Sequence, residues 1–266
     1  MSYVLEASAE FDRLERQAAL PGYDFHRELA LAGVSPRPGH AILDAGCGSG
    51  VVTRHLARSH PQCTVTGCDL GADRLASAAR LARDIPNITF SHQDLARLDF
   101  PAESFDLVFC RYVLQHVSPE GRASAVAEFK RCLRPGGKAC LVDFDGTLYN
   151  LHPQTPLLSH LLGRLEREFP VDLRIGRKLP AMLVDAGFSN VRWRIDTVEC
   201  TGPRLEEEVG LTEERLTHAL EPLAVFFGSR AVACQFRDEY LAALQVDGAV
   251  LFYNKFVVTG VNERPC

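Results

Sequence analysis

Three aspartates in the first half of the chain each end a short, largely apolar run. Asp44 ends AILD, Asp69 ends TVTGCD and Asp94 ends ITFSHQD. Carboxylates accept hydrogen bonds from hydroxyl and amino groups, and they attract cationic nitrogen. If the runs are parallel strands, their carboxyl ends meet at one edge of a sheet, where nucleotide-like ligands bind. The pattern predicts a site for a ligand with an amine, ribose hydroxyls and a base.

A glycine-rich turn, GCGSG at residues 46–50, follows the first run. Glycine allows a sharp turn and a close approach of the backbone to a ligand. A dinucleotide-binding turn has the spacing G-x-G-x-x-G, but here Gly50 comes one residue early and Val51 follows it. The carboxylate of Asp44 beside the turn favours a cationic amine and would repel a pyrophosphate. The alternative interpretation is a tight strand-to-helix turn without a functional role.

The apolar runs alternate with helical patterns. Strands are expected at residues 41–44, 64–69, 88–94, 105–110, 138–144, 191–200 and 249–261. Helical patterns between the first five of them predict right-handed crossovers and a parallel sheet with helices on both faces. The strands are apolar along most of their length, as strands buried on both faces are. The fold class is therefore α/β, a Rossmann-like, doubly wound sheet.

Composition excludes several classes of protein. Of the 266 residues, 46% are hydrophobic and 24% are charged, which is typical of a globular domain. The absence of a long apolar run, together with a charged first segment, argues against a membrane span or an export signal. The net charge of -5 gives no basic face for nucleic acid. Nine cysteines without C-x-x-C spacing predict a reduced, cytoplasmic protein with no metal site.

In this order, the motifs resemble those of the class I S-adenosylmethionine-dependent methyltransferases, which have a seven-stranded Rossmann-like fold, and most closely their small-molecule branch. The resemblance covers roughly residues 38–200. It rests on the glycine turn and on CDL, HQDL, FDLVFCRYVLQH and LRPGGK further along. It implies a mostly parallel sheet whose last strand is antiparallel, S-adenosylmethionine as cofactor and a small-molecule methyl acceptor as partner, with no nucleic acid and no membrane.

The resemblance also assigns the glycine turn to the methionine part of the cofactor. The residues that match this part of the family motif are Asp44, Gly46, Cys47, Gly48 and Gly50.

Five further residues match family positions that contact the cofactor. Asp69 corresponds to the acid that binds the ribose, and Leu70 beside it to an apolar contact with adenine. Asp94 and Leu95 correspond to the pair that binds adenine after the third strand. Arg111 falls where the chain after the fourth strand lines the methionine moiety.

Methyl transfer is an in-line displacement, so the protein mainly aligns the nucleophile with the methyl group. His116, just after the fourth strand, is the candidate base, since an imidazole suits proton removal near neutrality. A structural histidine at a helix end is the alternative. Asp143 and Asp145 end the fifth strand and are candidates to orient an acceptor amine or hydroxyl, or to pair with Arg111. Metal-dependent relatives have an acid directly after the fourth strand, whereas this chain has Cys110-Arg111.

Segments outside the core are expected to form a helical cap. The expected units are an N-terminal helical cap segment (1–37), a cofactor-binding core (38–145), a loop and helix insertion followed by a helix and the sixth strand (146–200), a helical cap insertion (201–249), and the last strand and tail (250–266). With the sixth strand parallel to the core and the last antiparallel, the segment between them emerges on the cofactor side. Such excursions are commonly lids. Their alternative role is an interface in a homo-oligomer.

Two rival functions remain. A nicotinamide-dependent Rossmann oxidoreductase is disfavoured by Asp44 and by the missing third glycine position. A non-catalytic cofactor-binding or scaffold protein stays open, because no base is certain. The preferred hypothesis is a methyltransferase that moves a methyl group from S-adenosylmethionine to nitrogen, oxygen or carbon of a small acceptor, a specialised metabolite, in a capped pocket.

Overall fold

The structure is a computed structural model that describes residues 15–16 and 23–263. Within these residues an eight-stranded sheet has the order β3-β2-β1-β4-β5-β8-β6, and β7 pairs with β8 outside this path. The strands are β1 (Ala41–Ala45), β2 (Thr64–Asp69), β3 (Ile88–His92), β4 (Phe105–Arg111), β5 (Leu133–Asp145), β6 (Leu151–His152), β7 (Ser189–Cys200) and β8 (Val250–Val261). The helices near the sheet are α2 (Phe25–Ala32), α3 (Val51–Ser59), α4 (Ala72–Leu81), α5 (Pro119–Cys132) and α7 (Leu179–Asp185).

The strand directions are those of the expected fold. Strands β1 to β5 pair in parallel. Strand β8 runs antiparallel to both β5 and β7, so β7 points the same way as β5. The Rossmann-like, mostly parallel sheet with an antiparallel last strand is therefore confirmed, with the two-residue β6 as an addition. Strand β5 begins at Leu133 rather than at Lys138, because both residues pair with β4 across a register shift.

Apolar residues on the two faces of the sheet form two separate cores. Adjacent residues of a strand point to opposite faces, and Ile42 and Leu43 of β1 accordingly lie in different clusters. Ile42 packs in one cluster with Phe25 of α2 and Leu56 of α3. Leu43 packs in the other with Phe129 of α5. The described helix of the N-terminal segment, α2, thus covers the core sheet.

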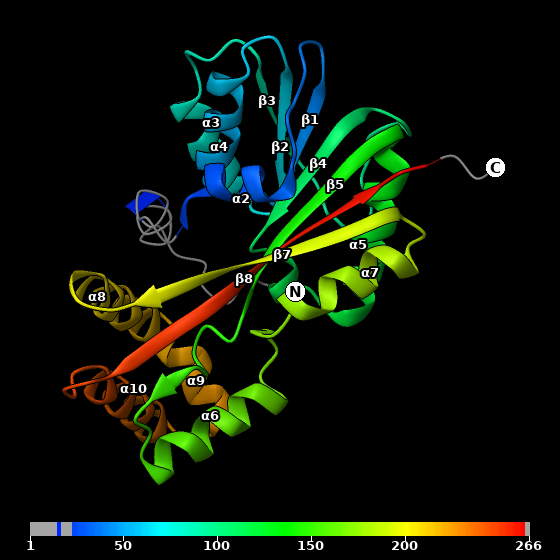
Figure 1. The fold of residues 1–266 in the computed structure, drawn as a ribbon. Coiled ribbons are helices and arrows are strands. Elements are labelled where there is room, and N and C mark those ends of the chain that lie inside the picture. The colour runs from blue at the N-terminus through cyan, green and yellow to red at the C-terminus, as the bar shows by residue number, and fades with distance from the viewer. Residues whose placement is uncertain (1–14, 17–22, 264–266) are drawn as a thin grey trace.

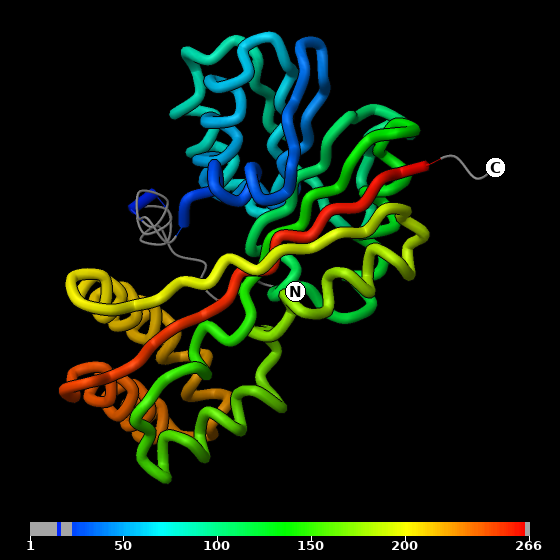
Figure 2. The backbone as a smooth tube through the Cα atoms, in the orientation of Figure 1, coloured from blue at the N-terminus to red at the C-terminus, as the bar shows by residue number. Residues whose placement is uncertain are grey.

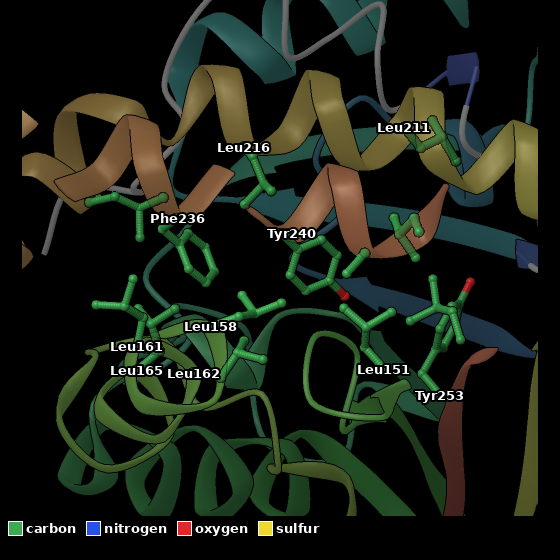
Figure 3. Close-up of a cluster of buried hydrophobic side chains, with 14 of the residues drawn as sticks. Leu151, Leu158, Leu161, Leu162, Leu165, Leu211, Leu216, Phe236, Tyr240 and Tyr253 are labelled. Carbon is green, nitrogen blue, oxygen red and sulfur yellow. The ribbon is translucent and has the colours of Figure 1, made fainter. Parts of the chain in front are cut away.

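Four helices form a separate layer at the far end of β7 and β8 (Figure 1). They are α6 (Pro156–Glu168), α8 (Pro203–His218), α9 (Leu220–Phe227) and α10 (Arg230–Leu244). We call this layer the cap. Figure 3 shows its core, in which leucines of α6 face Leu216 of α8 and Phe236 and Tyr240 of α10.

Two long strands connect the cap to the sheet. In the tube view of Figure 2, β7 and β8 run side by side from the sheet to the cap. At their cap end, Val198, Cys200, Leu251 and Tyr253 are buried in the cap core. The expected helices between the last two strands are therefore present and packed. Within the described residues, no helix is both long enough and apolar enough to span a membrane.

Candidate functional site

The carboxyl ends of β1, β2 and β4 meet where the strand order reverses. In the order β3-β2-β1-β4-β5 the chain proceeds outward from β1 to β3 on one side and from β4 to β5 on the other, so the order reverses between β1 and β4. Open α/β sheets bind ligands in the crevice at such a point. The turn after β1 is fixed to the end of β2, because the N–H groups of Gly46 and Cys47 both donate to the carbonyl oxygen of Cys68, at 2.8 and 2.9 Å.

The protein's own backbone conformation and packing explain glycines in this turn. Gly46, Gly48 and Gly50 have φ angles of 78°, 53° and 72°, in the left-handed region that favours glycine. A Cβ on Gly46 would lie 2.4 Å from Cγ2 of Val113, and one on Gly50 would lie 2.9 Å from Cβ of Ala78. The tight-turn interpretation therefore accounts for these two positions without any ligand. The case for a binding site rests on the acids around the turn.

Asp44 lies beneath the turn. Its side chain is buried and accepts a hydrogen bond of 2.6 Å from the hydroxyl of Thr53 on α3. Burial raises the pKa of Asp44 to about 6, against the opposing effects of the Thr53 hydrogen bond and the charge of Arg111. Near neutrality the carboxylate is thus largely ionised but poorly solvated, so a cationic amine beside it would be stabilised.

Asp69 joins the glycine turn to the start of α4. Its Oδ2 accepts from the N–H of Gly48 at 2.9 Å, and its Oδ1 accepts from the N–H of Gly71 at 2.8 Å. The guanidinium of Arg74 also donates to Oδ1, through Nη2 at 2.8 Å and Nε at 3.2 Å. The carboxylate therefore sits at the mouth of the turn, where a ribose is expected.

The residues expected at the adenine lie in different environments. Leu70 follows Asp69 and leaves 51% of its surface exposed, whereas Leu95 is buried in the core beneath the sheet. Asp94 is exposed and accepts from the N–H of Ala96 at 2.9 Å. An exposed leucine next to acids is an apolar surface that an adenine ring would cover. The carboxylates of Asp44 and Asp69 together with Leu70 thus fit an amino-acid nucleoside such as S-adenosylmethionine.

The guanidinium of Arg111, at the end of β4, forms its hydrogen bonds with other residues of the chain. Its guanidinium donates to both carboxylate oxygens of Glu28 on α2, at 2.6 and 3.2 Å, and to the carbonyl oxygen of Tyr23 at 2.7 Å. Glu28 has no exposed surface and also accepts from the hydroxyl of Tyr112 and from Nζ of Lys255. The alternative pairing of Arg111 with Asp143 or Asp145 is wrong, because its guanidinium pairs with Glu28.

Lys255 extends this cluster to the edge of the sheet. It is 1% exposed and forms ion pairs with Glu28 at 3.1 Å and with Asp196 of β7 at 2.7 Å. Asp196 in turn accepts from Nε of Arg27 at 2.8 Å. We call Glu28, Arg111, Lys255 and Asp196 the ion cluster. It joins α2 to three strands beside the predicted methionine end of the site.

Tyr112 follows Arg111 in a strained conformation. Its φ of 60° is unusual for a bulky residue, and such strain concentrates at functional sites. The Tyr112 ring stacks on Phe144, with the two ring centroids 4.0 Å apart. The guanidinium carbon of Arg111 lies 4.0 Å from the centroid of the Tyr112 ring. Tyr23 meets both rings edge-on. Phe25 of α2 packs instead against His26 and against His55 of α3.

The three candidate catalytic residues occupy the ends of β4 and β5. His116 closes the short helix η2 (Leu114–His116) directly after β4 and is partly exposed. Asp143 is buried beneath this helix and accepts from the N–H of Gln115 at 3.2 Å and of Phe144 at 3.0 Å. Asp145 is also buried and accepts from Nε of Arg177 at 2.7 Å and from its Nη2 at 2.6 Å.

Asp143 makes a testable contribution to pH-dependent stability. Burial raises its pKa from 3.8 to about 7, more than its two backbone hydrogen bonds lower it. A carboxyl group with a raised folded-state pKa stabilises the fold fully below pH 4, and this stabilisation is lost as the pH rises through about 7. We expect the Tm of Asp143→Asn, relative to the parent, to increase between pH 5 and pH 8. A pH-independent difference in thermal melts would contradict the raised pKa.

Residues 15 and 16 connect the turn to the cap. The carboxylate of Glu15 accepts from Nη2 of Arg54 at 2.7 and 2.8 Å, while Nη1 of Arg54 donates to the carbonyl oxygen of Ser49. Arg16 forms an ion pair with Glu214 of α8. Residues 15 and 16 therefore lie between α3, which follows the glycine turn, and α8 of the cap. The rest of the expected N-terminal cap, residues 1–14 and 17–22, lies outside the described residues.

Sequence reasoning missed the ion cluster and Arg74. Glu28 shares the buried face of α2 with Phe25 and Leu29, and Lys255 interrupts an apolar strand. A lone charge on an otherwise apolar face signals a buried ion pair, but not its partner. Across the described ranges, no three histidine, cysteine or acidic side chains gather as metal ligands would.

Comparison with known proteins shows the family. Residues 42–137 match the model of the methyltransferase domain. Trans-aconitate 2-methyltransferase of Deinococcus radiodurans is 38% identical over 242 residues, which cover 87% of this chain and 90% of that protein. Malonyl-[acyl-carrier protein] O-methyltransferase of Halalkalibacterium halodurans is 30% identical over 136 residues. The chain spans about half the length of this second relative and of a Streptomyces fradiae protein that it also matches (49% and 52%).

Solved structures share the fold at low identity. Phosphoethanolamine N-methyltransferase 2 of Haemonchus contortus, in complex with phosphomonomethylethanolamine and S-adenosylhomocysteine, superimposes with a TM-score of 0.64 at 19% identity, over 99% of this chain and 61% of that one. The cyclopropane synthase MmaA2 of Mycobacterium tuberculosis gives a TM-score of 0.60 at 16% identity, over 90% of this chain and 84% of that one. The chain belongs to the class I S-adenosylmethionine-dependent methyltransferases.

Proposed function

We propose that this chain transfers a methyl group from S-adenosylmethionine to nitrogen, oxygen or carbon of a small metabolite, in a pocket between the sheet edge and the cap. The single observation that carries the proposal is the pair of carboxylates, Asp44 and Asp69, on either side of the glycine turn at the point where the strand order reverses. An amine and a ribose are the groups that such a pair suits.

Separate residues are proposed for separate parts of the cofactor. Asp44 attracts the amino group, and the turn at residues 46–50 lines the methionine chain. Asp69 takes the ribose hydroxyls, while Leu70 and Asp94 face the base. Arg111 acts through Glu28 by holding the end of β4 in place, rather than by binding the ligand directly.

When bound, S-adenosylmethionine supplies an electrophilic methyl group on a sulfonium. The chain's task is to align the acceptor with that group and to exclude water. The proposal assigns to His116, which is partly exposed at the end of η2, the role of taking a proton from the acceptor on an imidazole nitrogen. Buried Asp143 fixes η2 through the N–H of Gln115 and is thus a positioning residue. Asp145 is held by Arg177, which makes it a weaker candidate for contact with the acceptor.

Changing Asp69 to alanine tests the cofactor site. The variant loses the acceptor of the ribose hydroxyls, so its affinity for S-adenosylhomocysteine should fall by about 1–3 kcal/mol, roughly 5-fold to 150-fold. Isothermal titration of the parent and the variant gives the difference. Asp99→Ala, at an exposed residue on the loop after β3, is the matched control and should leave the affinity unchanged.

The same titration separates the rival functions. The parent is titrated with S-adenosylhomocysteine and, independently, with NAD. Binding of NAD alone would establish the oxidoreductase alternative and end the proposal. Formation of S-adenosylhomocysteine from S-adenosylmethionine, followed over a panel of small carboxylates, amines and phenols, then identifies the acceptor class. A cytoplasmic location and oligomerisation through the cap stay predictions.

A further inference from the structure

The carboxylate of Asp69 has too few open acceptor positions for both hydroxyls of a ribose. A carboxylate offers about four lone-pair positions on its two oxygens. Four N–H groups already donate to Asp69: those of Gly48 and Gly71, and Nε and Nη2 of Arg74. Three of these donors converge on Oδ1. Among the described residues, Oδ2 accepts only from Gly48 and keeps one open position, whereas two ribose hydroxyls would bring two further donors to the same carboxylate.

Of these donors, only the side chain of Arg74 can move away from Asp69 without a change in the backbone of the site. The N–H of Gly48 belongs to the turn, whose neighbouring residues are bonded to β2, and the N–H of Gly71 begins α4. Arg74 is a side chain on the first turns of α4 that keeps 20% of its surface exposed. It can rotate toward solvent while the backbone stays in place.

The absence of a side chain at Gly71 leaves room for the guanidinium of Arg74 to reach Asp69. A Cβ on Gly71 would lie 2.5 Å from Cζ of Arg74 and 2.6 Å from its Nη2. The guanidinium therefore passes directly over the glycine, and any other residue at position 71 would displace it. Position 71 has a φ of -85°, which every residue can adopt, so the backbone conformation does not explain the glycine.

We propose that Arg74 occupies the ribose-binding carboxylate in the ligand-free chain and must leave Asp69 when the cofactor binds. This inference rests on the proposed function, since it takes Asp69 as the ribose acceptor. Arg74 neutralises this buried carboxylate while no ligand is present, and the free energy needed to break the ion pair opposes ligand binding. Arg74 thereby sets cofactor affinity without adding a contact of its own to the bound state.

Isothermal titration of Arg74→Met with S-adenosylhomocysteine tests the proposal. Methionine keeps an unbranched side chain and good helix propensity but has no donor. The variant should bind the ligand about threefold to tenfold more tightly than the parent, since a partly exposed ion pair no longer has to be broken. Arg80→Met, an exposed arginine on the same helix, removes the same charge and should change the affinity by less than about twofold.

A spectroscopic measurement follows the arginine itself. The Nε–H resonance of Arg74 is assigned by its absence from spectra of Arg74→Met, and it should shift markedly when S-adenosylhomocysteine is added to the parent. Unchanged or weaker binding by Arg74→Met, or an Nε–H resonance that the ligand does not move, would overturn the proposal. If the parent does not bind S-adenosylhomocysteine at all, the proposed function fails, which is a distinct result.

Discussion

Replacing His116 with glutamine should lower kcat by about 100-fold to 10,000-fold while leaving the affinity for S-adenosylhomocysteine unchanged. The residue ends η2 at the carboxyl edge of the sheet, directly after β4, and Asp143 fixes that helix from below. Glutamine retains hydrogen-bonding groups but cannot take up a proton near neutrality. The loss should therefore fall on the chemical step and not on cofactor binding.

The measurement is turnover of the acceptor found in the panel, in parallel with titration of S-adenosylhomocysteine. His160→Gln, at an exposed histidine on α6, serves as the control and should keep parental turnover. Parental turnover in His116→Gln would assign His116 a structural role. In that case the acceptor would need no base, as happens when the attacking atom carries no proton to remove.

Changing Glu28 to glutamine should lower the free energy of unfolding by about 3–5 kcal/mol. Glu28 is fully buried and compensates two buried cations, Arg111 and Lys255. Removing the negative charge leaves Arg111 without an acidic partner among the ion pairs of the described residues. Lys255 keeps Asp196, so most of the loss arises at the end of β4.

Urea unfolding of Glu28→Gln and of Arg27→Gln gives the comparison. Arg27 pairs with Asp196 at the periphery of the same cluster, but its side chain is 64% exposed. Its substitution should therefore cost less than about 1 kcal/mol. A loss below about 1 kcal/mol in Glu28→Gln would mean that water or a rearranged neighbour compensates Arg111, contrary to the packing of the ion cluster.

The sheet and the polar residues at its edge could be predicted because their signals are local. Asp44 and Asp69 each end an apolar run, and the helical patterns between the runs require parallel strands. Parallel strands place all their carboxyl ends at one edge. That edge therefore follows from the order of elements alone, before any side-chain contact is known.

Contacts between distant segments could not be predicted in the same way. Glu28 and Arg111 are 83 positions apart, and nothing in either neighbourhood selects the other as partner. The sequence pattern accordingly assigns Arg111 to the cofactor, whereas in the structure its guanidinium binds Glu28 of α2. Arg74 lies only five positions from Asp69, but nothing in the sequence around it shows that its guanidinium donates to that carboxylate. The burial of the cap helices likewise depends on how α6, α8 and α10 meet.

A crystal structure with S-adenosylhomocysteine tests the placement of the site most directly. We predict that the ribose hydroxyls contact Asp69, that the amino group lies beside Asp44 and the glycine turn, and that Arg74 has turned away from Asp69. A ligand bound elsewhere on the chain, or one whose ribose leaves the Asp69–Arg74 ion pair intact, would contradict this placement.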